Sequence, residues 1–261
     1  MSNTTPLLDQ LPIWGVFLIT VAILLLALEA GFRLGGYFQR RWPDHSESGV
    51  NTMVGASLAF LGFLLAFITG MAVNLFNERL HLVIDEANDI GTVYLRAGFM
   101  SEPWSTESRH LLQEYVDQRL ALIEPNRMQA AVLRSEEIQT ELWNRAQVYA
   151  KESPTPVTSL YISALNDLID IHTERLIMRF YVRVPQSVML GVYLVAVLTM
   201  VLIGVQSSYT GKRNYLALIL TILILAMVFL IIIDLDRPNQ GLIRIPQKAL
   251  LDLRQQLRAQ P

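Results

Sequence analysis

Cysteine is absent from the 261-residue sequence. Disulfides, thiolate metal sites, iron–sulfur clusters and cysteine nucleophiles are therefore excluded. Charged residues are also scarce, at 17% of the chain, whereas soluble domains carry about 25%. The 21 Lys and Arg residues nearly balance the 23 Asp and Glu residues, so the basic excess that is typical of nucleic-acid-binding proteins is missing. No nucleic-acid partner is expected.

Sequence motifs of catalysis are missing as well. The chain contains no G-x-S-x-G elbow, no Walker A loop, no G-x-G-x-x-G loop and no H-E-x-x-H helix. The four histidines (His45, His81, His110 and His172) are far apart in the sequence, so none of them has a histidine partner at the four-residue spacing of a helical metal site. We therefore expect neither an enzyme nor a bound metal or cofactor.

Long apolar runs are what the sequence does contain. Hydrophobic residues make up 52% of the chain and the mean hydropathy is +0.36. Four runs approach or reach the roughly 20 residues that cross about 30 Å of hydrocarbon: 13–32, 53–76, 188–205 and 215–233. No basic segment precedes the first run and no small-residue cleavage pattern follows it, which predicts a retained anchor. These features predict a multi-pass membrane protein, with the lipid bilayer as a partner.

A polar insert separates the second and third runs. Its apolar residues recur at helical spacing in three stripes: Leu112, Val116, Leu120 and Ile123; Ile138, Leu142 and Tyr149; and Leu160, Ala164, Leu168 and Ile171. Thr155 followed by Pro156 predicts the start of a helix, since the first residue is a favoured N-cap and the second suits the first helical position. After the fourth run, Pro238, Gly241 and Pro246 oppose a helix, and helical spacing then returns near the C-terminus.

The predicted fold is therefore an all-α integral membrane protein. Four transmembrane helices carry a helical extramembrane domain that is inserted between the second and the third. We expect a first helix pair at 1–76, the inserted domain at 77–184, a second helix pair at 185–236 and a C-terminal tail at 237–261 that packs on the inserted domain.

The side of the membrane that carries the insert stays open. Four crossings place the N-terminus, the insert and the tail on one side. The connections on the other side are basic, which favours an outside insert, but the insert flanks and the tail are basic too. The basic residues in those connections are Arg33, Arg40, Arg41, Lys212 and Arg213.

Three carboxylates follow the second run closely: Asp85, Glu86 and Asp89. If that run continues as one helix, Asp85, Asp89 and Arg96 fall on one face and need cations from elsewhere, because no Lys or Arg stands four residues from either aspartate. The predicted ion-pair network adds four residues after the fourth run, with Arg175, Arg179 and Arg183 as alternative partners. The four are Asp234, Asp236, Arg237 and Arg244. A docking network, an ion vestibule and a divalent-cation site remain alternatives.

The second run differs from the others in its small and polar residues. Phe63, Phe67 and Met71 recur at four-residue spacing, with Asn74 three residues further on. Around an oligomer axis, these residues would form a hydrophobic constriction followed by a ring of amides. The alternative is ordinary helix packing, in which small residues let helices approach closely.

Two segments carry a family resemblance, "DEANDIGTVYLRA" (85–97) and "DLDRPNQGLIR" (234–244). With the four-run arrangement, they resemble the bestrophin-like domain family of bacterial membrane proteins and, more distantly, the bestrophin channels. The resemblance implies a homo-oligomeric passive channel for small inorganic ions in a bacterial inner membrane. It would be pentameric and anion-selective if it is like bestrophins proper, with the second transmembrane helix lining the pore. The alternative is a non-conducting scaffold or sensor whose helical domain binds a partner.

Overall fold

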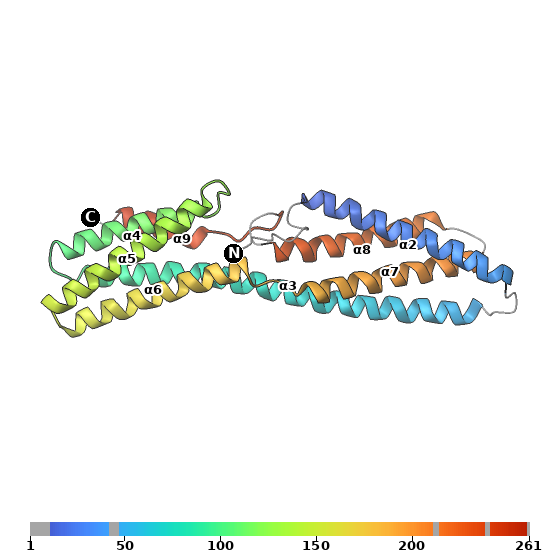
Figure 1. The fold of residues 1–261 in the computed structure, drawn as a ribbon, viewed down its shortest axis with the longest axis horizontal. Coiled ribbons are helices and arrows are strands. Elements are labelled where there is room, and N and C mark those ends of the chain that lie inside the picture. Colours follow the sequence, from blue (N-terminus) through green and yellow to red (C-terminus); the bar gives the residue numbers. More distant parts are fainter. Residues whose placement is uncertain (1–10, 42–46, 211–213, 238–240, 260–261) are drawn as a thin grey trace. The chain divides into compact units, whose positions relative to one another are not determined.

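The computed structural model describes residues 11–41, 47–210, 214–237 and 241–259, and these residues form α-helices and irregular segments without a β-strand (Figure 1). In chain order the helices are α2 (Ile13–Arg41), α3 (Glu47–Ala97), α4 (Trp104–Ala121), α5 (Met128–Glu152), α6 (Pro156–Phe180), α7 (Gln186–Tyr209), α8 (Tyr215–Asp236) and α9 (Lys248–Ala259). The all-helical prediction is confirmed for the part of the chain that the structure describes.

The chain divides into two compact units. The apolar unit takes residues 1–76 and 183–244, and the polar unit takes residues 77–182 and 245–261. Both contain part of α3, which is one continuous helix. The condition set for the carboxylate face, that the second run continues as one helix, is therefore met. Each unit is a set of helices around its own hydrophobic core.

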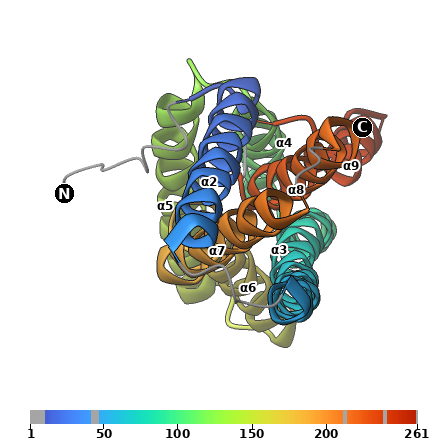
Figure 2. The ribbon, with the colours of Figure 1, turned by 90° about the vertical axis from the view of Figure 1, so that its right-hand side faces the viewer.

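The apolar unit contains α2, α7, α8 and the first part of α3. These four helices are long and apolar enough to cross a membrane. Figure 2 views this unit end-on, with α3 at the margin of the group. Helix α2 continues beyond the predicted end at residue 32, so Arg33, Arg40 and Arg41 lie on the helix rather than in a loop. Lys212, Arg213 and Pro238 lie outside the described residues.

Helices α2 and α7 approach each other closely at glycines. A Cβ atom added at Gly31 would overlap the backbone of Val201, and one added at Gly204 would overlap the Leu28 carbonyl. The contact is therefore backbone against backbone, which is how small residues bring membrane helices together. Nearby, the Thr20 hydroxyl lies 2.8 Å from the Tyr193 hydroxyl, which ties the same two helices.

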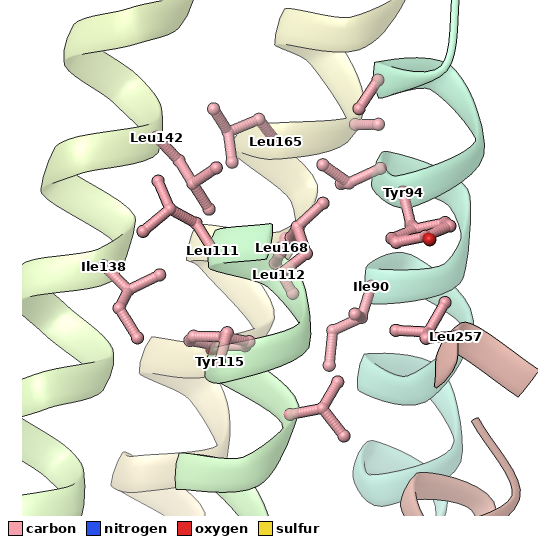
Figure 3. Close-up of a cluster of buried hydrophobic side chains, with 14 of the residues drawn as sticks. Ile90, Tyr94, Leu111, Leu112, Tyr115, Ile138, Leu142, Leu165, Leu168 and Leu257 are labelled. Carbon is pink, nitrogen blue, oxygen red and sulfur yellow. The ribbon is translucent and has the colours of Figure 1, made fainter. Parts of the chain in front are cut away.

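The polar unit contains α4, α5, α6, α9 and the last part of α3 around one core (Figure 3). Most residues of the helical stripes of the insert are buried as predicted. Leu120 is half-buried, and Ile123 and Leu160 are 44% and 53% exposed. Ile123 lies beyond the end of α4, where helical spacing no longer applies. On α6 the buried stripe starts one residue later, at Tyr161, which aligns better with Leu165 and Leu168.

Capping residues define the start of α6, and a non-helical segment precedes α9. The Thr155 side chain accepts a hydrogen bond from the Thr158 N–H and Pro156 occupies the first turn, so the predicted start of α6 is confirmed. After α8, residues 241–247 form no helix, and α9 then places Leu250, Leu253 and Leu257 in the core of the polar unit.

Candidate functional site

Within the apolar unit, one face of helix α3 packs against the core and the opposite face is exposed. Its inward face buries Leu61, Leu65 and Ile68 in the core. Its outward face carries Phe63 and Phe67, which are 67% and 59% exposed, together with exposed Asn74. Met71 is half-buried at the edge of this face, because each four-residue step rotates a position by about 40° around the helix. The chain thus leaves three of the four predicted pore residues uncovered.

Three glycines in the apolar part of α3 make no packing contact with the described residues outside their own helix. A Cβ atom added at Gly55, Gly62 or Gly70 would meet no atom within 4 Å. This differs from Gly31 and Gly204, where a Cβ would strike a neighbouring backbone. The small residues on the outward face of α3 are therefore available for a contact that the single chain does not make.

The structure separates the three carboxylates that follow the second run. Asp85 is exposed and Asp89 half-buried, and neither makes an ion pair within the described part of the polar unit. Glu86 is fully buried instead. It lies on the buried stripe of α3 with Val83, Ile90 and Val93, and the helix rotation of about 100° per residue decides which acid faces the core. The expectation that Asp85 and Asp89 form the pair-bearing face is wrong, and Glu86 has that position.

Glu86 is the centre of a buried cluster built from four helices. Its Oε1 lies 2.7 Å from the Nε of Arg119 on α4, and its Oε2 is paired with the guanidinium of Arg175 on α6. The Tyr115 hydroxyl donates to Glu86 Oε1 at 3.3 Å and accepts from the Gln139 Nε2 of α5 at 3.1 Å. The same hydroxyl lies 3.0 Å from the His172 Nδ1 of α6. We call these side chains with Arg179 the buried arginine cluster.

Sequence reasoning named Arg175 as an alternative partner but missed Arg119. The signal was present, because Arg119 follows Leu112 by seven residues and Val116 by three, and so lies on the predicted apolar stripe of α4. Arg179 does not reach Glu86 in a hydrogen bond and donates to the Leu122 carbonyl at 2.7 Å. Arg96 donates to the Leu160 carbonyl.

Burial sets the protonation of the cluster. Desolvation, with a smaller contribution from Arg119, lowers the pKa of His172 to about 3, so this imidazole is neutral at pH 7. Desolvation also lowers the pKa of Arg175 to about 9, helped by the charge of Arg179, and that of Arg179 to about 10, helped by Arg119. Both guanidiniums remain charged at pH 7. Burial raises the pKa of Tyr115, which therefore keeps its proton.

The residues after α8 form a second set of contacts, inside the apolar unit. Asp234 is buried and accepts the N–H groups of Leu242 and Ile243 at 2.9 and 2.8 Å. Gly241 packs so closely on this carboxylate that a Cβ would overlap it.

The next two charged residues of the same motif fix other segments of the apolar unit. Asp236 accepts the Val184 N–H at 2.9 Å and lies 4.0 Å from Arg183 Nη1. Arg237 donates to the Leu11 carbonyl at 3.0 Å. Arg244 is exposed. The motif "DLDRPNQGLIR" thus holds chain segments where they enter and leave the apolar helices.

A divalent-cation site gains no support from the side chains. Within the described ranges, no group of three or more His, Asp or Glu side chains could hold a metal ion.

An all-helical membrane protein with four apolar helices is the class that this architecture defines. The model of the bestrophin-like domain matches residues 21–250, and the chain belongs to that family. Comparison with curated proteins gives no match.

Solved structures support the fold. A variant of a bacterial bestrophin homologue from Klebsiella pneumoniae is similar with a TM-score of 0.63 and 12% identity, over 94% of this chain and 99% of that chain. A structure described as a membrane protein gives the same TM-score and identity, over 93% of this chain and 96% of that one.

Proposed function

We propose that the protein is a passive ion channel of the bestrophin type in a bacterial inner membrane. The observation that carries the proposal is the outward face of α3, where two phenylalanines are exposed and three glycines have open space beside them in the described part of the chain. Family membership and the similarity to bestrophin homologues support it.

In this proposal α3 lines a pore around the axis of a symmetric homo-oligomer. Phe63, Phe67 and Met71 form an apolar neck, and Asn74 forms an amide ring next to it. An apolar constriction resists ion passage because ions must lose hydration water there, and it gates by wetting and dewetting. The glycines allow α3 helices of adjacent subunits to approach closely. By analogy with bestrophins, the permeant species are small inorganic anions and the oligomer is a pentamer.

The polar unit is proposed to lie outside the membrane. With four crossings, as proposed here, it would share one side of the membrane with the segments that precede α2 and follow α8. Its exposed charged residues, such as Glu136 and Glu137, suit contact with water rather than lipid.

The test is ion flux from proteoliposomes containing the purified protein, with chloride and potassium measured separately. Phe67→Ser should raise flux of the permeant ion at least about tenfold, because a polar neck stays hydrated. Leu194→Ser on α7 is the matched control, since Leu194 is also exposed, at 57%, but outside the proposed neck. A non-conducting scaffold or sensor would show no flux in the wild type or in either variant, together with a monomeric particle, and that result would refute the channel.

A further inference from the structure

The buried arginine cluster contains more positive than negative charge. Arg119 is 1% exposed and the Arg175 side chain 9%, whereas Glu86 supplies one carboxylate with no exposed surface. Arg179 lies close enough for its charge to act on Arg175 and to be acted on by Arg119. The remaining members, Tyr115, Gln139 and neutral His172, add no charge. The cluster therefore contains two guanidiniums paired with Glu86, the half-buried guanidinium of Arg179 and one carboxylate.

This excess is unusual because buried charges are normally paired. Glu86 is the acidic side chain that pairs with Arg119 and Arg175 among the described residues. A neighbouring subunit cannot supply another acid to Arg119, because this side chain is enclosed by the polar unit itself.

Two guanidinium donors of the cluster are also unused. Arg119 Nη1 and Arg179 Nε are buried and have no hydrogen-bond partner among the described residues. Buried donors are nearly always satisfied in folded proteins, by protein, water or a bound ligand. Unused guanidinium N–H groups in a region of excess positive charge favour a negatively charged acceptor over water.

We propose that the buried arginine cluster binds a small inorganic anion, which accepts hydrogen bonds from Arg119 and Arg179. Glu86 then has a positioning role, because it holds Arg119 and Arg175 through their contacts with its two oxygens and leaves other guanidinium donors free. The site lies within the helical core of the polar unit and does not depend on ion conduction by α3.

The experiment measures the thermal unfolding of the purified full-length protein at pH 7.5 and constant ionic strength, while chloride replaces gluconate. Gluconate is much larger than chloride, so it serves as the reference anion. We expect a saturable rise in Tm of about 5 °C or more when chloride exceeds its Kd a hundredfold, because a ligand of the native state stabilises it by mass action. Bromide should act like chloride, and phosphate and sulfate report on the size of anion that the site accepts.

Two variants should change the chloride effect in opposite directions. Arg179→Gln removes one charge and one donor, so the rise in Tm should shrink by at least half. Glu86→Gln leaves three guanidiniums without a carboxylate, so the rise should exceed that of the wild type even though the starting Tm is lower. Arg134→Gln is the control: Arg134 is paired with Glu114, Glu137 and Glu141 outside the cluster, and its loss should leave the rise unchanged.

The wild-type measurement decides the proposal if a variant does not fold. An identical Tm in chloride and gluconate would overturn it. Equal loss of the chloride effect in Arg134→Gln and Arg179→Gln would also overturn it, since the effect would then come from the general charge of the protein. Neither result depends on flux, so failure of this proposal and failure of the channel are distinguishable.

Discussion

Glu86 and Asp85 are neighbours in the chain but have opposite environments. Glu86 is enclosed between two guanidiniums, and Asp85 faces solvent. Removing one member of a buried ion pair leaves the other charges without compensation, and this is more costly than the net value of the pair. The structural importance of the acidic segment is therefore concentrated in one residue.

Glu86→Gln should lower the free energy of unfolding by about 3–5 kcal/mol, because Arg119 and Arg175 would remain buried without their carboxylate. Asp85→Asn, one residue away, should change it by about 0.5 kcal/mol or less, as is usual for exposed sites. Chemical denaturation in detergent measures both. Equal effects of the two substitutions would contradict the assignment of Glu86 as the buried partner.

His172 should make stability depend on pH. Its pKa is lowered to about 3 in the folded protein from an ordinary value of 6.5. Between these values the unfolded chain binds a proton that the folded chain does not, so stability is present above pH 6.5 and is lost as the pH falls toward 3. The slope contributed by this residue approaches about 1.4 kcal/mol per pH unit.

Unfolding measured from pH 7 to pH 4.5 tests this slope against the variant His172→Asn, whose amide can replace the contact with the Tyr115 hydroxyl. The groups around the imidazole, Tyr115, Arg119 and Glu86, are the same in both proteins. The wild type should therefore lose more stability than the variant on acidification, and parallel pH profiles would contradict the assignment.

At the scale of the helices, glycines distinguish two kinds of contact. Gly31 and Gly204 are required where α2 and α7 touch backbone to backbone, whereas Gly191 on α7 has open space around it. Gly204 and Gly191 therefore differ although both lie on α7: the first packs against the α2 backbone, and the second has no described atom beside it.

Gly204→Leu should separate α2 from α7, because the overlap of the new side chain is with backbone that cannot rotate away. We expect a loss of about 3 kcal/mol or more in unfolding free energy, or failure to fold. Gly191→Leu on the same helix should be close to neutral. Yield of monodisperse protein and Tm in detergent are the measurements, and comparable behaviour of the two variants would show that the crossing is not tight.

The helices themselves were largely predictable from the sequence, and the side-chain partners were not. Thr155 with Pro156 marks the start of α6 because capping and proline geometry act over a few residues. Ile123 and Leu160 were misplaced because helical phase shifts by a residue near helix ends. Arg119 was missed because pattern reading treats an arginine on an apolar stripe as an exception, although a buried carboxylate from a distant helix makes it part of the core.

At the scale of the whole molecule, the outward face of α3 is the feature that the single chain leaves unexplained. All four apolar helices expose hydrophobic side chains, which lipid can cover. Lipid alone gives no reason for the combination of Gly55, Gly62 and Gly70 with Asn74 on one helix. An arrangement of α3 helices around a central axis, as proposed above, explains both features. The glycines would permit close approach of adjacent helices, and the Asn74 amide would face water.

The absence of cysteine makes this arrangement directly testable, because any introduced thiol is unique in the chain. Asn74→Cys should react within minutes with a charged, water-soluble thiol reagent, since a pore position is hydrated, and modification should change ion flux severalfold. Leu194→Cys on α7 is equally suited to a membrane position but is predicted to face lipid, so it should react at least about tenfold more slowly and leave flux unchanged. Thiol reactivity is measured in proteoliposomes by mass spectrometry alongside flux. If both cysteines are protected and flux is unaffected, α3 faces lipid and its glycines serve a contact other than a pore.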